Sequence, residues 1–596
     1  MRPRIVCFLV CLALLLPGFN SQGQSHAIPL LPTARNAADY PGTSIVESIQ
    51  AALGGCNGTP FTPCEIYVPS GHYQVSAIST WQARDTTGSR VGIALPSNIE
   101  LRGAGAGHTV IEVHRAKGDP PATLFANAQP GNINIHLHDM TILWSDAATS
   151  YDWVSIFICR ACRDVELDHL SLEGNPNKLV NLLDSTDSSV HDNAFHLHTT
   201  GYGHGDNALS FSRFDPAVEV AGDAGVVRDN RFAEIGDQHG FSMLIVSQSA
   251  LFVHSNVFEA HLPPPGTATG IESGQDNLGH LPRNVKISGN VLHGASIAYG
   301  GLDSSEISGN FLDHGDIYIA LQEGSTDSAT LLTVADNELH FGSINFGGLQ
   351  GTFTGRSIIT HNRVFDGWIS AGNSLVMRDM EVSYNSVRNS RGHAGLECDA
   401  CSVVRGNLVR EVGQNGPGDR GAGYVLSGEI SDVSDNLYLD EQQEYDAGSV
   451  CSIAKPSSTE CLSSGKSRWV MLRGGAWGFG WTNRVLFTER GNLNIRGFVN
   501  KGVLQLDDDV DALPAGTRYH LYRTTYDAFQ LNAASIERFA NNAAISTTGP
   551  FRNAAVEENR EITIHSLSAN VFRPYKCVGT CRIDYANRAG SPPERK

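Results

Sequence analysis

Positive charge is scarce in this sequence, and lysine is its rarest charged residue. Lys and Arg total 43 against 62 Asp and Glu, so the formal net charge is −19. Proteins that bind nucleic acid neutralise phosphates with clustered Lys and Arg, which this chain lacks. After the N-terminal segment no stretch approaches the roughly 18 apolar residues of a membrane-spanning helix. The sequence therefore argues against nucleic acid as a partner and against a membrane span.

Long disordered segments and long helices are also not indicated. The 596 residues are 41% hydrophobic and only 18% charged, which is typical of a folded chain too long for one ordinary core. The 62 glycines point to many tight turns. The first 27 residues carry Arg2 and Arg4, an apolar run from residue 5 to 16, and a small-residue end at Ala27. This pattern predicts a secretory signal peptide over 1–27 and a secreted protein, extracellular, periplasmic or on the cell surface.

The cysteines agree with export. Cys7 and Cys11 fall in the signal, and the other ten form five close pairs: Cys56/Cys64, Cys159/Cys162, Cys398/Cys401, Cys451/Cys461 and Cys577/Cys581. Short-range pairs in an oxidising compartment predict disulfides that close small loops. The two CxxC pairs have the composition of a zinc site with four cysteine ligands. About nine stacked coils at ~4.8 Å each would hold them roughly 43 Å apart, so we assign no metal ligands.

A short repeat occupies residues 160 to about 440. Each unit has a few β-formers alternating with polar residues, then an Asn, an apolar residue and a Gly-rich turn. From Asn230 to Asn436 there are eight intervals in 206 residues, about 26 each, in the range of solenoid repeats. No helical pattern separates the strands, so βαβ units are not indicated. The recurring residues are Asn193, Asn230, Asn256, Asn290, Asn310, Asn337, Asn362, Asn385, Asn407 and Asn436.

These features predict an all-β chain built as a right-handed parallel β-helix solenoid. Each coil buries its apolar face only by stacking on its neighbours, and an Asn at the same corner can pass amide hydrogen bonds to the next rung. SIVESIQAAL has apolar residues at helical spacing after Thr43 and Ser44, which predicts an N-terminal capping helix. We expect the β-helix over 28–445 and a small C-terminal antiparallel β module over 446–596. Most aromatics of that module, Trp469, Trp477, Phe479 and Trp481, are expected in its core.

The N-terminal motifs carry a family resemblance. The capping helix, the VPSGHY element, LPSNIELRGAG and the Asn-bearing coils together resemble the pectate lyase superfamily over about residues 34–440. The resemblance implies a right-handed parallel β-helix. That superfamily includes glycoside hydrolases, polysaccharide lyases, epimerases and phage tailspikes, so it does not fix the chemistry.

Acids and histidines gather between Asn193 and Pro282, which makes this the candidate active region. It holds His196 and His198, and we take Asp206, Asp237, His239 and Glu272 as candidate catalytic residues on successive rungs. If Ile271 faces the core, Glu272 points outward. Asp206 and Glu272 are expected two rungs apart, roughly 9.6 Å, which suits an inverting glycosidase with a water between its acids. Solvated loops or a calcium site are the alternative readings of the same cluster.

Further residues are candidates for binding sugar: His204, Asn207, Asp276, Tyr318 and Asn345. The GHG around His204 is similar to a motif of pectin-type glycoside hydrolases, but the paired Asp elements and the basic motif that accompany it there are missing. We therefore give His204 no catalytic role. A second cluster, Arg391, His393, Glu397 and Asp399, has no equally polar neighbouring rungs and ranks lower.

Three functions remain open from sequence. The acidic field favours a neutral or weakly charged glycan, and thus a glycoside hydrolase with paired carboxylates and no cofactor. The first alternative is a calcium-assisted polysaccharide lyase or epimerase acting on uronates, with His239 as base. The second is a noncatalytic surface glycan-binding or tailspike-like protein. A polysaccharide or cell-surface glycan is the expected partner in every case.

Overall fold

The computed structural model describes residues 34–583 except 77, 86, 117, 147–153, 200–206, 213–223, 237–241, 262–267, 275–279, 299, 301, 321–330, 348–351, 354, 374–375, 378, 391–393, 400, 413–421, 441–443, 474–484, 501, 523–526, 547–555, 559–561, 571–574 and 578–580. The predicted signal peptide lies outside these residues. No helix among the described residues is long and apolar enough to cross a membrane.

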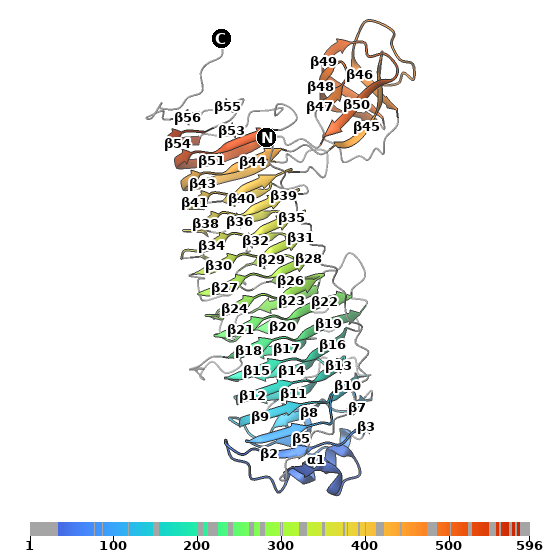
Figure 1. The fold of residues 1–596 in the computed structure, drawn as a ribbon, viewed down its shortest axis with the longest axis vertical. Coiled ribbons are helices and arrows are strands. Elements are labelled where there is room, and N and C mark those ends of the chain that lie inside the picture. The colour runs from blue at the N-terminus through green and yellow to red at the C-terminus, as the bar shows by residue number, and fades with distance from the viewer. Residues whose placement is uncertain are drawn as a thin grey trace, which may run out of the picture.

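The chain winds into a long stack of parallel coils, as the repeat predicts (Figure 1). Each full coil adds one strand to each of three series, and strands of a series pair in parallel with the coil before and after. The fold is a right-handed parallel β-helix, the hand that parallel crossover connections almost always take. Two series share the 33-stranded sheet, and the third forms the 15-stranded sheet.

We name each series after a member strand. The β14 series contains β5 (Arg90–Leu95), β8 (Ala122–Asn127), β11 (Ser155–Arg160), β14 (Lys178–Leu183), β17 (Asn207–Ser212), β20 (Ser242–Val246), β23 (Ala268–Ser273), β26 (Ala295–Ala298), β29 (Ile317–Ile319), β32 (Ile344–Gly347), β36 (Ile369–Asn373) and β40 (Leu396–Asp399). The β15 series contains β1 (Arg35–Asn36), β2 (Cys64–Tyr67), β6 (Ile99–Arg102), β9 (Ile133–His138), β12 (Arg163–Asp168), β15 (Ser188–His191), β18 (Gly225–Arg228), β21 (Leu251–His254), β24 (Lys286–Ser288), β27 (Ser305–Ser308), β30 (Leu332–Ala335), β34 (Ile358–Thr360), β38 (Glu381–Ser383) and β41 (Val403–Arg405).

The β16 series is the 15-stranded sheet: β3 (Gly71–Val75), β7 (Thr109–Arg115), β10 (Thr141–Asp146), β13 (Ser171–Gly174), β16 (Ala194–Thr199), β19 (Arg231–Gly236), β22 (Val257–His261), β25 (Val291–His293), β28 (Phe311–Asp313), β31 (Glu338–His340), β35 (Arg363–Phe365), β39 (Ser386–Arg388), β42 (Leu408–Arg410), β44 (Leu437–Asp440) and β52 (Ala543–Ser546). Smaller elements are η1 (Ala37–Asp39), η2 (Ile78–Thr80), β4 (Ala83–Arg84), β33 (Thr352–Phe353) and β37 (Val376–Met377).

Inward side chains of successive coils stack into one continuous apolar core. Phe195, Phe232 and Phe258 lie in register on β16, β19 and β22, with consecutive ring centroids 4.7 Å apart. All three side chains are completely buried. This spacing is the distance between neighbouring strands of a sheet, so each ring rests on the ring of the next coil.

The predicted Asn corners form a continuous hydrogen-bonded ladder. The Asn310 backbone N–H and Nδ2 both donate to Oδ1 of Asn337, at 3.0 and 2.9 Å, and Nδ2 also donates to the Ile287 carbonyl. The same arrangement runs from Asn193 to Asn436, and every one of these residues is buried. The residue before each corner has a positive φ, for example 55° at Asp229 and 63° at Gly309. The prediction of structural asparagines is confirmed.

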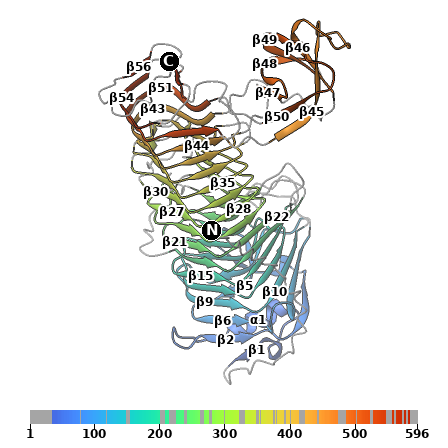
Figure 2. The same cartoon turned by 45° about the horizontal axis from the view of Figure 1, so that its top comes forward.

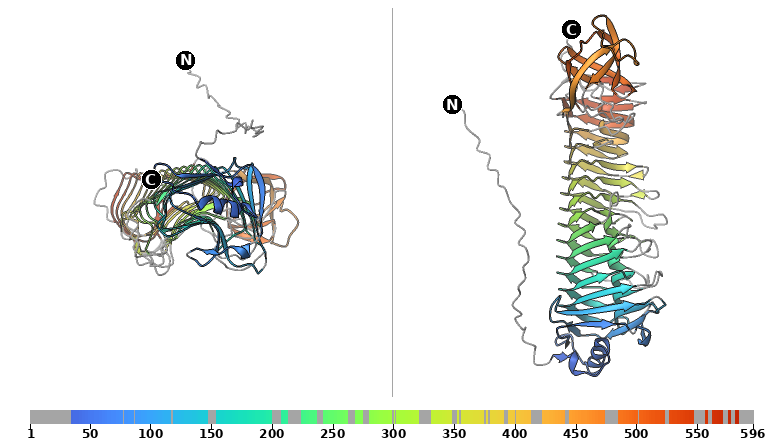
Figure 3. Two further views of the ribbon diagram at one scale, coloured as in Figure 1. Left: turned by 90° about the horizontal axis from the view of Figure 1, so that it is seen from below. Right: turned by 90° about the vertical axis from the view of Figure 1, so that its right-hand side faces the viewer.

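Helix α1 (Ile45–Leu53) closes the N-terminal end of the stack (Figure 3). The Ser44 Oγ accepts the Glu47 backbone N–H at 3.3 Å, and the Glu47 carboxylate accepts the Thr43 backbone N–H at 2.6 Å. The pair resembles a capping box, except that the Glu47 carboxylate bonds the residue before the N-cap Ser44. Ile45, Val46 and Ile49 are buried against the first coils, so the predicted cap is confirmed.

The C-terminal region differs from the predicted single module over 446–596. Six antiparallel strands do form a small closed barrel: β45 (Glu444–Ile453), β46 (Lys466–Arg473), β47 (Val485–Thr488), β48 (Gly491–Asn500), β49 (Val503–Asp511) and β50 (Thr517–Tyr522). The chain then returns to the β-helix through β51 (Asp527–Ala540), which pairs in parallel with β43 (Ala422–Ser434). The remaining strands, β53 (Val556–Glu558), β54 (Ile562–Ser568), β55 (Tyr575–Cys577) and β56 (Cys581–Ile583), extend the same sheet.

The barrel is therefore an insertion between two coils (Figure 2). The Asn ladder continues across the insertion. Nδ2 of Asn436 donates to Oδ1 of Asn542, 106 residues later, and Nδ2 of Asn542 donates to Oδ1 of Asn570. In the barrel, Trp469 is half-buried against Cys451 and Ile453. Trp477, Phe479 and Trp481 lie outside the described residues.

Four of the five predicted cysteine pairs are disulfides: Cys56–Cys64, Cys159–Cys162, Cys398–Cys401 and Cys451–Cys461. Cys577 and Cys581 lie on strands whose side chains are outside the described part of the structure. The two CxxC disulfides each begin on a strand of the β14 series, β11 and β40.

Candidate functional site

The described residues contain four of the nine predicted site residues: Glu272, Asn207, Tyr318 and Asn345. The other five, His204, Asp206, Asp237, His239 and Asp276, lie outside the described residues.

Glu272 points away from the core, as its sequence context predicts. Its neighbour Ile271 is completely buried in the core, and side chains alternate across a strand. We call the register-aligned outward positions of the β14 series the Glu272 row. Tyr318 and Asn345 belong to it, because Glu272 pairs with Ala298, Ala298 with Tyr318, and Tyr318 with Asn345. The fold thus brings three of the predicted site residues to one outward row, with Tyr318 37% exposed.

A second outward row lies beside the first on β14, β17, β20 and β23. Lys178, Asn207, Ser242 and Thr269 pair in register along it. Two hydrogen bonds connect the rows. Lys178 Nζ donates to Ser210 Oγ at 3.1 Å, and the Ser242 hydroxyl donates to the Glu272 carboxylate. The Asn207 amide Nδ2 donates to the Ser242 carbonyl at 2.8 Å. We call these residues, with Asn181 of the Glu272 row, the Lys178–Glu272 cluster.

Buried polar atoms without partners concentrate in this cluster. Asn181 is completely buried, and neither its Oδ1 nor its Nδ2 has a hydrogen-bond partner among the described residues. The Asn207 Oδ1 atom is in the same situation. Leaving a buried donor or acceptor unpaired costs about 1–3 kcal/mol. Such groups call for an explanation in terms of ordered water, an ion or a ligand.

Lys178 is itself only 9% exposed. Burial disfavours its charged form and lowers the pKa of the ammonium to about 8, although the nearby negative charge of Glu272 opposes this shift. The side chain therefore titrates close to neutral pH. A buried lysine of this kind is able to donate or accept a proton under ordinary conditions.

The register also bears on the proposed carboxylate pair. Two strands before Glu272 in its row stands Ser210, which pairs through Ile245. Asp206 directly precedes Asn207 in the sequence. Asn207 aligns with Thr269 two strands later, and Thr269 lies three positions before Glu272. The structure thus aligns Glu272 with Ser210 two rungs earlier.

The predicted histidine cluster is divided between faces. His196 and His198 lie on β16, and His198 Nε2 is 3.1 Å from Oε1 of Glu173 on β13 of the same sheet. They therefore face outward from a different sheet than Glu272 does. From the lower-ranked cluster, Glu397 joins the Glu272 row through Ser370, and Asp399 accepts the Ser427 hydroxyl at 2.9 Å. Arg391 and His393 lie outside the described residues.

Sequence reasoning missed Lys178, Asn181, Ser210 and Ser242. The predicted site was based on acids and histidines after the Asn corner. Lys178, Asn181, Ser210 and Ser242 lie on the strand of the coil that follows. One signal was present: Lys178 begins a strand, KLVNLL, that is otherwise nearly all apolar and carries Asn181 in its middle.

No family model matches this chain, and no curated protein matches it in sequence. Solved structures do resemble it. The A-module of the mannuronan C-5 epimerase AlgE6 from Azotobacter vinelandii is 14% identical, with 94% of this chain and 100% of that chain covered and a TM-score of 0.32. The tailspike protein of E. coli bacteriophage HK620, in complex with a pentasaccharide, is 10% identical, with 82% and 94% covered and a TM-score of 0.41.

The catalytic unit of a GH87 α-1,3-glucanase from Streptomyces thermodiastaticus is 14% identical, with 68% of this chain and 69% of that chain covered and a TM-score of 0.39.

Proposed function

We propose that this protein is a glycoside hydrolase that binds a neutral or weakly charged polysaccharide along the Glu272 row and cleaves it at the Lys178–Glu272 cluster. Glu272 serves as one catalytic carboxyl, held by the Ser242 hydroxyl. The second carboxyl comes from Asp206 or Asp237, which flank strands of the same region in the sequence. The observation that carries the proposal is the fully buried amide of Asn181, without a partner among the described residues, in the same outward row as the oriented Glu272 carboxylate and three strands before it.

The shape of the row supports a chain-like ligand. Glu272, Tyr318, Asn345 and Glu397 repeat along the stack at the strand spacing of about 4.8 Å per rung. An exposed tyrosine offers an apolar ring face and a hydroxyl, a combination suited to sugars. The formal charge of −19 opposes binding of a polyanion unless cations bridge it.

A second candidate function rests on Lys178. Elimination or epimerisation of a uronate needs a base that removes a carbon-bound proton, and an amine with a pKa of about 8 is suited to this step. In this alternative the Lys178 amine takes the proton, and calcium or a cationic group neutralises the uronate carboxylate. The hydrolase remains our first proposal because Glu272 and the acidic field favour it.

The test is an activity screen of the chain from Ile28 onward on neutral and uronate polysaccharides, with and without a chelator. New reducing ends without ultraviolet absorbance, abolished by Glu272→Gln, support the hydrolase. Ultraviolet absorbance of an unsaturated sugar, abolished by Lys178→Met, would replace it with the lyase. Proton exchange at the uronate carbon without cleavage would indicate the epimerase.

The matched control is Glu306→Gln, which removes an equivalent charge from the β15 series, where Glu306 pairs with Lys286 at 3.6 Å. This variant is expected to retain full activity. Glycan binding without turnover in the unmodified protein would refute both enzyme proposals and leave a binding protein.

A further inference from the structure

A second polar cluster lies on the outward face of the β15 series, near the N-terminal end of the stack. Glu100 on β6 pairs in register with His136 on β9, and His138 stands two positions further along β9. One donor atom from each of these three residues lies within 4.8 Å of the other two. The His136 and His138 rings are stacked, with centroids 4.1 Å apart. All three residues are partly buried.

The distances suit a small divalent cation. The His138 Nε2 and Glu100 Oε1 atoms are 3.1 Å apart. Two donors bound at 2.0–2.1 Å to a tetrahedral zinc ion lie about 3.3 Å from each other. Two imidazoles with one carboxylate make a donor set that leaves a position open, and imidazole favours zinc and its neighbours over calcium.

Both imidazoles are also held by a second carboxylate, as is usual for histidines that bind metals. The Asp139 Oδ2 atom is 3.0 Å from Nδ1 of His138, opposite the nitrogen that faces Glu100. The Asp168 Oδ2 atom is 2.5 Å from Nε2 of His136, and its other oxygen contacts His169. Because the two rings are stacked nearly parallel, one of them must turn for both imidazoles to bind one ion.

The charge around the three residues is negative. Glu100, Asp139 and Asp168 surround the two histidines, while the nearest arginine, Arg102, is committed to Glu65 at 2.7 Å. The surroundings therefore attract a positive charge to this point.

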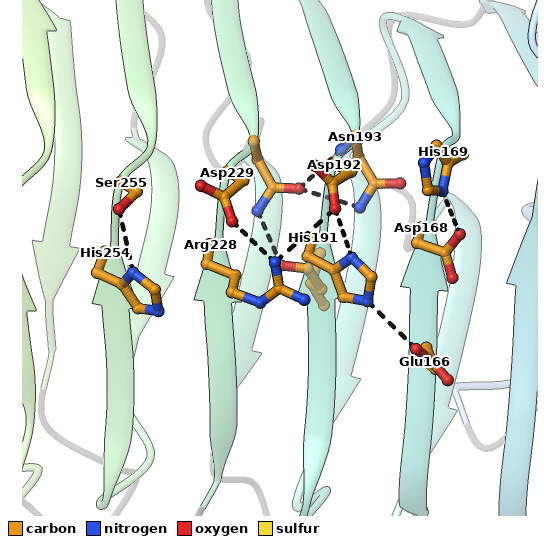
Figure 4. Close-up of polar contacts among 12 residues, drawn as sticks. Glu166, Asp168, His169, His191, Asp192, Asn193, Arg228, Asp229, His254 and Ser255 are labelled. Atoms are coloured by element: carbon orange, nitrogen blue, oxygen red, sulfur yellow. Dashed lines mark hydrogen bonds and ion pairs between the residues drawn. The ribbon is translucent and has the colours of Figure 1, made fainter.

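The cluster has a boundary further along the same face (Figure 4). His191 contacts Glu166 at 3.2 Å and Asp192 at 2.8 Å. On the next strand Arg228 Nη1 lies 2.8 Å from Asp229 and 3.8 Å from Asp192. A guanidinium thus supplies the positive charge in that part of the face, and no external cation is needed there.

The coils themselves do not require these side chains. The row that contains His138 continues through Asp168, His191, Arg228 and His254, and then through Ser288, Ser308, Ala335, Thr360 and Ser383. Small residues therefore fill the same position in the later coils without disturbing the stack. The histidines and carboxylates of the first coils are additional to what the fold needs.

We propose that Glu100, His136 and His138 bind one divalent transition-metal ion of the zinc class, with Asp139 and Asp168 orienting the two imidazoles. The site is separate from the Lys178–Glu272 cluster, because it lies on the β15 series and not on the β14 series. It is independent of the glycan activity proposed above.

The test is titration of chelator-treated protein with Zn²⁺, followed by calorimetry and by metal analysis after dialysis. One Zn²⁺ per chain is expected, with Ca²⁺ binding at least tenfold more weakly. His138→Ser and Glu100→Gln are expected to weaken Zn²⁺ binding at least tenfold. Asp139→Asn keeps all three ligands and is expected to weaken it 10- to 100-fold.

The matched control is His254→Ser, since His254 lies in the same row and contacts Ser255 at 3.2 Å. It is expected to bind Zn²⁺ as the unmodified protein does. Because serine already occupies the row in later coils, His138→Ser is expected to keep the native circular dichroism spectrum. Absence of saturable Zn²⁺ binding, or equal binding by the His138→Ser and unmodified proteins, would overturn the proposal.

Discussion

Replacement of Lys178 by methionine is expected to stabilise the fold. Burial lowers the pKa of this lysine from 10.5 to about 8. At 1.36 kcal/mol per pKa unit, the buried charge costs the folded state about 3 kcal/mol at neutral pH. Methionine has a similar length and carries no charge, so Lys178→Met removes this cost.

The gain will be smaller than the full cost. The variant loses the hydrogen bond from Lys178 to Ser210, which is worth about 1 kcal/mol, and Glu272 loses a favourable charge nearby. We therefore expect a net stabilisation of about 1–2 kcal/mol at pH 7. The double variant Lys178→Met, Glu272→Gln removes both charges and is expected to be at least as stable as the single variant.

The pH dependence identifies the cause. The folded protein releases the Lys178 proton near pH 8, and the unfolded chain releases it near pH 10.5. Between these values the unfolded state binds more protons, so the unmodified protein gains stability relative to the variant as the pH rises. The advantage of Lys178→Met is expected to be full below pH 8, to shrink as the pH rises, and to be lost before pH 10.5, because the variant lacks the hydrogen bond to Ser210 at every pH.

The measurement is the difference in Tm between the two proteins at matched pH values from 7 to 10.5. A difference that does not change with pH would show that burial of the charge is not the cause. A variant less stable than the unmodified protein at pH 7 would refute the reasoning as a whole.

Two further predictions concern the coils. Asn310→Ala leaves the Asn290 backbone N–H and Nδ2 and the Ile287 carbonyl without their partner, so we expect a loss of about 3 kcal/mol or more, seen as a lower Tm than in the exposed control Arg363→Gln. Unchanged stability would contradict a structural role for the ladder. Gly342→Ala is expected to prevent native coil stacking, because a Cβ there would lie 1.9 Å from the Gly315 carbonyl oxygen; a native circular dichroism spectrum and Tm would argue against that packing.

The fold was largely accessible from sequence because its main determinants are local and repeated. The Asn corner recurs from coil to coil with a buried apolar residue two positions after it, and it forms the predicted ladder. Ser44, one of the two predicted N-cap residues, likewise marks the start of the capping helix. The barrel insertion was not accessible, because it separates Asn436 from Asn542 by 106 residues and so interrupts the period on which the prediction depended.

The sites were less accessible because they depend on register between coils of unequal length. Successive corners are 37 residues apart from Asn193 to Asn230 but only 20 apart from Asn290 to Asn310. Sequence spacing therefore does not say which outward residues align. Glu100 and His136 meet only because β6 and β9 pair in one particular register, and the residue that aligns with Glu272 two rungs earlier is Ser210.

The outward rows also show where this chain departs from what stacking requires. A β-helix coil specifies its inward residues and its corner, and it leaves the outward positions free to vary. In later coils the outward positions hold small side chains, as at Ser288, Ser308 and Ala335. Lys178 and Asn181 instead place a charge and an amide without a described partner at positions where small residues would be more stable. Because these groups oppose the stability of the coils that carry them, packing does not account for their presence. A ligand that pairs the Asn181 amide would account for that amide, and this is the physical basis for our proposal of a site on the first half of the stack.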